Sequence, residues 1–253
     1  MKRAGLFLLA TCVALLAAPL MAQTPSSAIV RVAIWKVKPG MGKQFQDGVR
    51  KHNEFHVKVN DPVALETWEV TSGDDTGTFL RIVSLPNWAA YDTPNYDTAA
   101  DEADSATNID PYMEAGPVRW WRFLPEVSHG PMTGTPPAMD EVLFFHLNMG
   151  YGRDFSALIK KITDAARASN WGVHYYWYVL ENGGEHPTFA LVIPKQKMAD
   201  FDDPPVTFQA MLEKALGRAE AEMVYRALDK SIHCQRSQTI AYRGDLSYTP
   251  AKK

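Results

Sequence analysis

The chain has 253 residues, of which 46% are hydrophobic and 22% charged, and its formal net charge at pH 7 is −3. A chain of this length can bury one large core or two small ones, and its slightly acidic balance lacks the basic surface typical of nucleic-acid-binding proteins. We therefore expect a globular protein whose partners do not include nucleic acid.

The first 22 residues have the three parts of a cleavable signal peptide. Lys2 and Arg3 form a basic start, a short apolar run follows, and Ala22 precedes a polar break. We expect cleavage after Ala22 and hence an exported protein, periplasmic or secreted, with no membrane attachment once it is cleaved. Cleavage also removes Cys12, so Cys234 would be the single cysteine and no intramolecular disulfide is expected.

The rest of the chain contains two similar halves. Residues 30–94 align with residues 140–204 without a gap, and glycines and aromatic residues coincide. The matches include Gly40/Gly150, Phe45/Phe155, Asn60/Asn170, Gly73/Gly183, Phe79/Phe189 and Pro94/Pro204. We interpret the pattern as an internal duplication: a domain at 28–128, a Pro/Gly-rich linker at 129–139 and a second domain at 140–248.

Both halves have the same predicted order of elements. In the first half, β-branched and aromatic runs predict strands at 30–38, 64–70, 78–85 and 118–128, with a helix from about Lys43 and an acidic helical region at 96–115. In the second half, strands are predicted at 141–149, 174–180, 188–194 and 237–247, with a helix from about Arg153 and a helical region at 205–232. This order is β-α-β-β-α-β twice, an α+β class built from ferredoxin-like units.

The duplicated pattern resembles the dimeric α+β barrel superfamily. The resemblance is carried by the first strand running into Lys38-Pro39-Gly40, by the helix around Phe45, and by the segment 79–92. That segment is similar to the corresponding part of NIPSNAP-like domains. The superfamily also includes antibiotic-biosynthesis monooxygenases, EthD-like proteins and the heme-binding relatives of chlorite dismutase. The resemblance implies two sheets packed face to face around a cavity, here within one chain, but it implies no particular activity.

Strand parity should separate residues under the helices from residues in the cavity. In the first strand of each half we assign the even-numbered residues to the cavity, including Lys36 and His146. In the third strand, Leu80 and Ile82 are expected under the helices, which places Arg81 in the cavity. The second strands are ambiguous because both faces are mixed, and we favour as cavity residues Glu66, Trp68, His174, Tyr176 and Tyr178.

A cavity with aromatic walls and a few polar groups suits a small planar or aromatic ligand. Because a histidine beside a tyrosine can move a proton, we assign His146, His174 and Tyr176 as candidate catalytic residues. The candidate ligand-binding residues are Lys36, Glu66, Trp68, Arg81 and Tyr178. The competing interpretation is that these are aromatic core residues whose polar tips find a partner or water.

Three classes of function stay open on this pattern. The chain is an exported oxygenase, isomerase or lyase that needs no cofactor, or a non-catalytic periplasmic protein that binds a ligand or heme, or an assembly module. No cofactor is expected, with heme as the alternative. The candidate heme ligands are His146, His174 and His233, and none lies in a recognisable motif. A small-molecule partner is expected in the first two classes, and a homo-oligomer is compatible with all three.

One further motif places His52 and His56 four residues apart on a predicted helix. This spacing can offer two imidazoles to one metal ion. The second half has Ile162 and Ala166 at the equivalent positions, on the face that packs against the sheet. We therefore expect no metal here, but two partly buried imidazoles that bond to the chain around the helix end, with Glu54 in solvent. The acidic run at 97–110 is interpreted as a solvated helix or loop.

Overall fold

The computed structural model describes residues 27–132 and 134–251. The predicted signal peptide lies outside these residues. None of the described helices is long and apolar enough to cross a membrane.

The described chain folds into two consecutive units with the same order of elements. The first unit contains β1 (Ile29–Val37), α1 (Gly42–Lys58), β2 (Glu66–Ser72), β3 (Phe79–Leu85), η1 (Trp88–Tyr91), α2 (Thr98–Asn108), η2 (Asp110–Tyr112), β4 (Met113–Phe123) and η3 (Pro125–Val127). The second contains β5 (Met139–Leu147), α3 (Gly152–Ala168), β6 (Tyr176–Asn182), β7 (Thr188–Lys195), η4 (Met198–Phe201), α4 (Phe208–Leu216), α5 (Arg218–Ser231), β8 (Ile232–Tyr242) and η5 (Gly244–Leu246).

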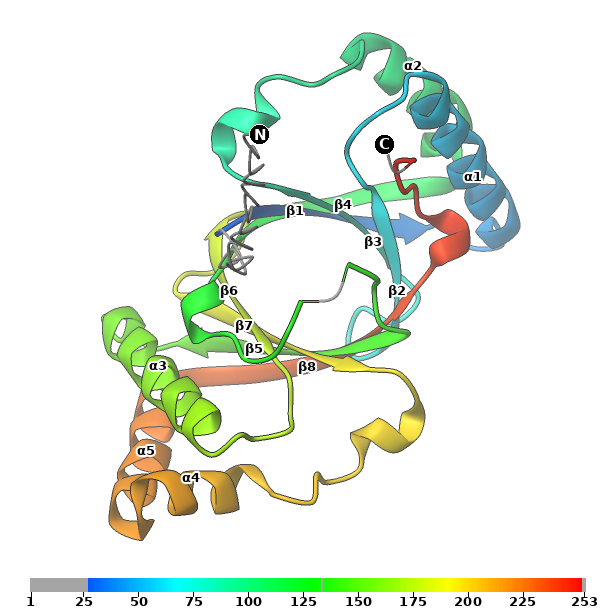
Figure 1. Ribbon diagram of the computed structural model, residues 1–253. Helices are drawn as coiled ribbons and strands as arrows, with labels where there is room; N and C mark the ends of the chain where they lie inside the picture. Colours follow the sequence, from blue (N-terminus) through cyan, green and yellow to red (C-terminus); the bar gives the residue numbers. More distant parts are fainter. Residues whose placement is uncertain (1–26, 133, 252–253) are drawn as a thin grey trace, which may run out of the picture.

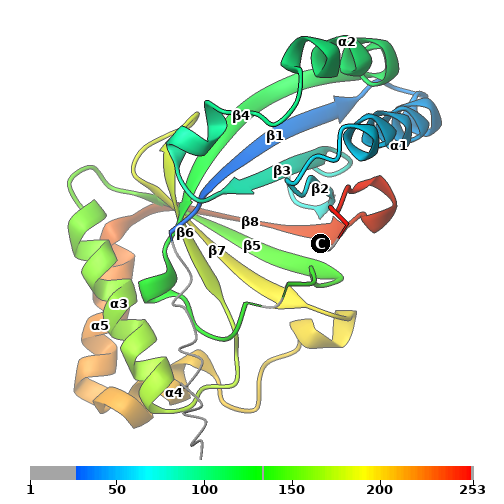
Figure 2. The same cartoon turned by 45° about the horizontal axis from the view of Figure 1, so that its top comes forward.

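The strands close into one antiparallel barrel in the order β1-β3-β2-β8-β5-β7-β6-β4. Each unit supplies a four-stranded sheet, and the two sheets are joined where β2 pairs with β8 and where β4 pairs with β6. Figure 1 shows the barrel nearly end-on, with α1 and α2 outside one sheet and α3, α4 and α5 outside the other. Figure 2 shows the same separation of helices from a second direction. The prediction of an α+β fold with two tandem ferredoxin-like units in an intrachain barrel is confirmed.

The two units share their unusual backbone positions as well as their order. Asn60 and Asn170 follow α1 and α3 with φ of 50° and 51°, in the left-handed region that asparagine tolerates better than most residues. Gly40 and Gly150 have φ of 75° and 90° in the turns before the same helices. These four residues therefore form the turns that begin or end equivalent helices.

Apolar side chains on the outer faces of the sheets bind the helices. Phe45 and Val49 of α1 are fully buried against Phe79, and Phe155 and Ile159 of α3 are fully buried in the corresponding place of the second unit. A separate apolar cluster faces the inside of the barrel and includes Ile34, Trp68, Val70, Leu80 and Trp121. Both faces of each sheet are therefore apolar. Strand parity then gives little contrast between the cavity face and the face under the helices.

The predicted parity of β3 is wrong. Leu80 and Ile82 face the barrel interior, and Arg81 lies on the other face, beneath α1. The Arg81 side chain is only 5% exposed. Its guanidinium donates to Thr67 Oγ1 at 2.8 Å, to the Leu246 carbonyl at 3.0 Å and to Asn53 Oδ1 at 2.6 Å. A buried cation with several acceptors is stable where a lone one would not be, and this network could not be seen in the sequence.

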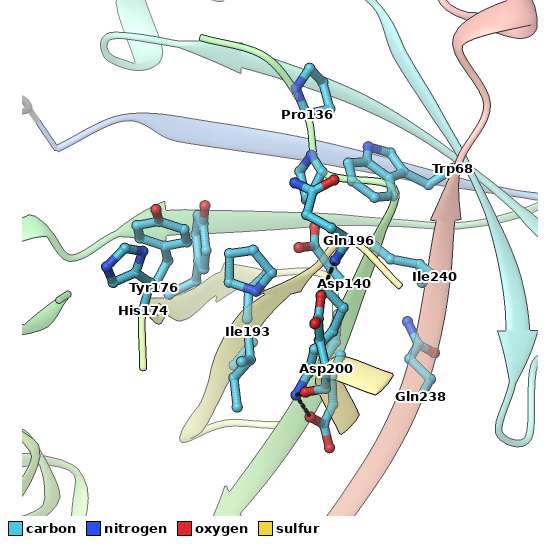
Figure 3. Close-up of a pocket in the computed structure, with 18 of the residues that line it drawn as sticks. Trp68, Pro136, Asp140, His174, Tyr176, Ile193, Gln196, Asp200, Gln238 and Ile240 are labelled. Carbon is cyan, nitrogen blue, oxygen red and sulfur yellow. Dashed lines mark hydrogen bonds and ion pairs between the residues drawn. The ribbon is translucent and has the colours of Figure 1, made fainter. Parts of the chain in front are cut away.

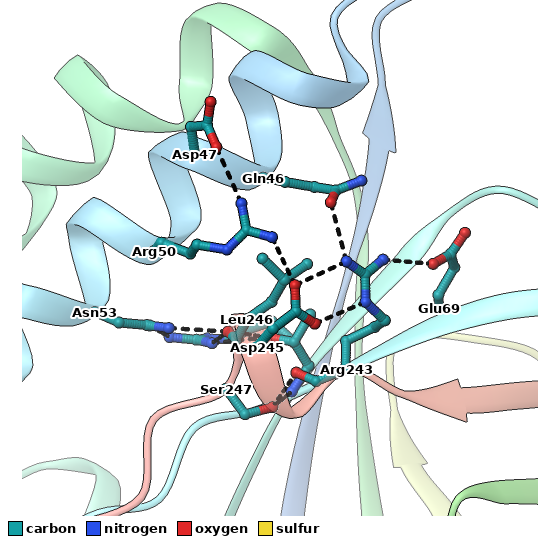
Figure 4. A network of polar contacts seen from close by, with 11 residues as sticks. Gln46, Asp47, Arg50, Asn53, Glu69, Arg243, Asp245, Leu246 and Ser247 are labelled. Carbon is teal, nitrogen blue, oxygen red and sulfur yellow. Dashed lines mark hydrogen bonds and ion pairs between the residues drawn. The ribbon is translucent and has the colours of Figure 1, made fainter.

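Each unit also receives a short segment from the other. The segment after β8 docks on α1 of the first unit, where Leu246 is fully buried and Asn53 Nδ2 donates to its carbonyl. The segment after β4 docks on α3, where Thr163 Oγ1 donates to the carbonyl of Val127. Figure 4 shows the first docking site, in which Asp245 accepts from the guanidinium groups of Arg50 and Arg243. These two docked segments join the two units outside the barrel wall.

The backbone of Asn108, at the end of α2, lies directly against Gly48 of α1. A Cβ atom built there would overlap the carbonyl oxygen of Asn108. We expect Gly48→Ala to displace α2 and to lower the free energy of unfolding by about 1–3 kcal/mol, because backbone cannot move aside as a side chain can. Chemical denaturation measures this, with Gly42→Ala in the same helix as control, since nothing lies near its Cβ position. Equal effects of the two substitutions would contradict the prediction.

Candidate functional site: the barrel cavity

The barrel encloses a cavity of about 1150 Å³ that extends to one end of the molecule. Alternate residues of the strands form its wall, as the pleat requires. The apolar part of the wall comprises Val30, Val32, Ile34, Trp68, Val70, Leu80, Ile82, Trp121, Val142, Phe144, Ala190, Val192 and Ile240. A volume of this size is in the range of small-molecule sites, and the interior is not filled by side chains.

Two loops of the second half of the chain line the mouth. The linker contributes Pro131, Met132 and Pro136, and the segment between β7 and α4 contributes residues between Gln196 and Thr207. In Figure 1 the linker passes in front of the barrel opening. Figure 3 shows Pro136 and Gln196 on the Trp68 side of the mouth, with His174 and Tyr176 on the other side. A ligand would therefore enter between segments that are not part of the barrel.

The structure brings most of the predicted second-strand residues to the cavity wall. These are Glu66, Trp68, His174, Tyr176 and Tyr178. Lys36 and His146 share the parity of the wall residues, but they lie near the ends of β1 and β5 and do not line the cavity. Arg81 is excluded from it because its strand face turns toward α1.

A polar group of four residues lies within this apolar wall. It consists of Glu66, Asp140, Tyr176 and Tyr178. Burial, with the nearby Glu66 carboxylate as a second cause, raises the pKa of Asp140 to about 7. Burial and then the Asp140 and Glu66 carboxylates raise the pKa of Tyr178 well above its usual range. At neutral pH this cluster therefore holds one carboxyl group poised to give or take a proton, beside a phenol that stays protonated.

Sequence reasoning missed Asp140. It is 8% exposed and lies on the cavity wall. A signal was present in the sequence: Asp140 has the same parity as Val142 and Phe144, and the aligned residue of the first half is Val30. A carboxylate on a cavity face, at a position where the other half has valine, indicates a role other than core packing.

Glu66 and Trp68 form one fixed unit of the wall. Trp68 Nε1 donates to Glu66 Oε2 at 3.0 Å. The Trp68 ring also packs against Tyr242 at a centroid distance of 5.2 Å. The Glu66 carboxylate is thereby kept beside the cavity, from where it disfavours ionisation of Asp140.

His174 and Tyr176 hold the linker at the mouth. Tyr176 Oη donates to the Pro131 carbonyl at 2.6 Å, and the His174 ring packs directly against Gly130. Gly130 has φ of 101°, and a Cβ atom there would overlap the His174 ring. In this conformation both side chains position the linker over the cavity.

His146 lies in a different environment, at the end of β5. Its Nδ1 is 3.0 Å from Thr188 Oγ1 and 3.7 Å from a Glu185 carboxylate oxygen. Burial lowers the pKa of His146, so it is neutral at physiological pH. It is fixed by these neighbours outside the cavity wall.

The residues present do not fit heme in this cavity. Of the three histidines considered as axial ligands, only His174 lines the wall, and its ring is packed against Gly130. Glu66 and Asp140 on the wall are carboxyls, and heme would bring two propionates of the same charge, although Arg119 and Lys195 also line the cavity. A neutral ligand, or one that can donate to Asp140 and Glu66, matches the interior better.

Comparisons with known proteins agree with the fold. No protein-family profile matches the sequence, and no curated protein sequence matches it. Among solved structures, the chain is similar to a candidate monooxygenase from Lactobacillus acidophilus NCFM, with a TM-score of 0.53 and 11% identity over 89% of this chain and 98% of that one. A chlorite dismutase variant from Candidatus Nitrospira defluvii has a TM-score of 0.51 and 13% identity over 86% and 93%. A candidate monooxygenase from Fusobacterium nucleatum subsp. nucleatum has a TM-score of 0.50 and 10% identity over 89% and 99%.

At such low identity the likeness concerns the fold alone: the chain shares the α+β barrel fold of these structures.

Proposed function

We propose that this chain is an exported protein that binds one small, planar, mainly apolar molecule in the barrel cavity and catalyses a proton transfer on it. The observation that carries the proposal is the Asp140 carboxyl group, buried in an apolar wall with a pKa raised to about 7. A general acid or base works best when its pKa is close to the working pH. Proton transfer of this kind is common to isomerases, lyases and cofactor-independent oxygenases.

The role of each wall residue follows from its position. Trp68, Trp121 and Phe144 offer flat apolar surfaces for the ligand. Asp140 accepts a proton from the ligand in its ionised form and returns it in its neutral form. Glu66, held by Trp68, keeps the pKa of Asp140 high, and the phenol of Tyr178 can donate a hydrogen bond to an oxygen of the ligand. His174 and Tyr176 act on the linker at the mouth.

The unequal polar groups of the two units support a small-molecule role over an assembly role. Glu66 stands opposite Tyr176 in the alignment, and Val30 opposite Asp140. An asymmetric pocket suits an asymmetric ligand. We also infer that the two units arose by duplication of a NIPSNAP-like domain, on the gapless alignment and the matching left-handed positions of Asn60 and Asn170.

The first test is the ligand itself. Full-length protein purified from its native compartment should carry a small aromatic or planar molecule, detected by native mass spectrometry, and its visible spectrum should show no Soret band. A stoichiometric Soret band would establish heme and contradict the proposal. Protein that binds no member of a library of small aromatic molecules, judged by the fluorescence of Trp68 and Trp121, would also contradict it.

The second test separates an enzyme from a carrier. With the ligand identified, Asp140→Asn should lower turnover by about 100-fold or more and should abolish a pH midpoint near 7. Asp154→Asn, an exposed aspartate on α3, is the matched control and should change neither. If the wild-type protein binds the ligand but never converts it, the protein is a carrier and the proposed catalysis is wrong.

A further inference from the structure

Three atoms that can each bind a metal ion converge between α1 and α2, outside the barrel. They are Nε2 of His52, Nε2 of His56 and Oδ1 of Asp101. The two nitrogens are 3.3 Å apart, and each lies 3.4 Å from the carboxylate oxygen. The His52 and His56 side chains are 8% and 3% exposed. The three atoms therefore form a nearly equilateral triangle in a mostly enclosed place.

Two other carboxylates fix the orientation of both imidazoles. His52 Nδ1 is 2.8 Å from Asp104 Oδ1, and His56 Nδ1 is 3.0 Å from Asp61 Oδ2. Because a carboxylate can only accept, each Nδ1 carries the proton and each Nε2 keeps its lone pair toward the triangle. A carboxylate behind a histidine is the arrangement that orients imidazoles in metal sites.

The orienting carboxylates are themselves held in place. Asp61 Oδ1 accepts from the backbone N–H of Val63 at 2.9 Å, and Asp104 Oδ1 accepts from Asn108 Nδ2 at 3.0 Å. Tyr248 Oη donates to the Asp61 carbonyl at 2.6 Å. The imidazoles are thus supported from the loop after α1, from α2 and from the C-terminal segment.

The third atom of the triangle has no hydrogen-bond partner among the described residues. Asp101 Oδ1 is buried and unsatisfied, and it faces two nitrogen lone pairs. Leaving a buried charged acceptor unpaired costs several kcal/mol as an order of magnitude, and three lone pairs at this distance repel one another. A cation at the centre of the triangle would satisfy all three atoms together.

The dimensions select the kind of cation. Zinc binds imidazole and carboxylate at about 2.0–2.2 Å with tetrahedral geometry, which places neighbouring ligand atoms about 3.4 Å apart. An octahedral ion with bonds of about 2.1 Å would need neighbouring ligands about 3.0 Å apart. The observed separations of 3.3 and 3.4 Å match the tetrahedral case.

We propose that His52, His56 and Asp101 bind one divalent ion of the zinc class, with Asp104 and Asp61 orienting the two imidazoles. The sequence predicts no metal here, because the second half has Ile162 and Ala166 at the equivalent positions, on the face that packs against the sheet. The third ligand comes from the acidic run that we had interpreted as a solvated helix or loop. The histidines do bond to the chain near the helix end, as expected, but their partners are carboxylates.

The ion would act as a structural bridge that holds α2 against α1. Of the residues of α2, only Asn108 is buried, so this helix contributes almost no apolar surface to the first unit. In the second unit, Ile162 and Ala166 stand at the positions of His52 and His56 and belong to an apolar cluster with Met211 and Leu212 of α4. A metal bridge therefore holds helix to helix in one unit where apolar packing does so in the other.

The test measures zinc in untagged full-length protein, produced in zinc-supplemented medium and dialysed. Wild type should hold about one zinc per chain, whereas Asp101→Asn and the double substitution His52→Ile with His56→Ala should hold less than about a tenth of that. The double variant takes the residues that the second unit has at these positions, so both new side chains are compatible with a helix of this kind. Glu102→Gln, an exposed neighbour on the same helix, is the matched control and should keep its zinc.

Cobalt provides a second readout that reports geometry. Cobalt(II) added to the metal-free wild type should give the intense visible bands of a tetrahedral complex, which Asp101→Asn should lack. Wild-type protein that takes up neither zinc nor cobalt would overturn the proposal, and so would equal zinc content in wild type and Asp101→Asn. Loss of zinc from Glu102→Gln would show that the ion lies elsewhere.

Discussion

Asp140→Asn is expected to raise the free energy of unfolding by about 4 kcal/mol at about pH 9, while changing it little at about pH 4. Burial and the Glu66 carboxylate raise the pKa of Asp140 from 3.8 to about 7 in the folded chain. Each unit of difference between folded and unfolded pKa corresponds to about 1.4 kcal/mol. The contribution of this group to stability is complete below its unfolded pKa and is lost as the pH rises through about 7.

The measurement is thermal or chemical denaturation of both proteins across that pH range. The gap between variant and wild type should open between about pH 4 and pH 7 and then stay constant. Asp154→Asn should show no such gap. A gap that does not depend on pH would mean that the Asp140 carboxyl is not held neutral by its surroundings, and it would remove the physical basis for its role as an acid or base. A stabilising substitution at a proposed active site is also what a trade-off between stability and function predicts.

Arg81→Leu is expected to lower the free energy of unfolding by about 4 kcal/mol. Leucine is the residue of the second half at this position, Leu191, so the side chain is compatible with the fold itself. The loss arises because Asn53 Oδ1 and the Leu246 carbonyl lose a charged donor while they stay buried. Burial lowers the pKa of Arg81 to about 10, so the group is charged at neutral pH and the effect should not change between about pH 5 and pH 8.

Urea denaturation measures the change, and Arg81→Lys is the informative companion. Lysine keeps the charge, but its single ammonium group cannot donate to Thr67, Leu246 and Asn53 together as the planar guanidinium does. It should therefore recover less than half of the lost free energy of unfolding. A fully stable Arg81→Leu variant would show that these acceptors find other partners or water. A substitution on the neighbouring strand β1, Lys36→Leu, should cost less than about 1 kcal/mol, since Lys36 is exposed.

The inside and the outside of the barrel carry different polar chemistry. Inside the barrel, Asp140 and Glu66 form an acidic centre that suits proton transfer on a bound molecule. Outside it, His52, His56 and Asp101 form the proposed metal site that fastens α2. The second unit has apolar residues at the positions of His52 and His56, so the two halves of the duplicated pattern differ in how their helices are held.

The sequence by itself determined the architecture of this protein. The gapless alignment of the two halves, with Gly40 on Gly150 and Asn60 on Asn170, predicted equal units, and both residues proved to occupy matching backbone positions. It also placed Glu66, Trp68 and Tyr178 on the cavity wall. Local pattern suffices for such features because turns and strand alternation depend on neighbouring residues.

Only the tertiary structure decided which polar residues act together. Parity could not place Arg81, because a barrel with an apolar interior makes both faces of β3 apolar and removes the contrast on which the prediction depends. Burial in the closed barrel, and then the Glu66 carboxylate of the other unit, raise the pKa of Asp140. Asp101 meets His52 and His56 only because α2 packs on α1. Burial and charge coupling arise between residues far apart in the chain, so they exist only in the folded molecule.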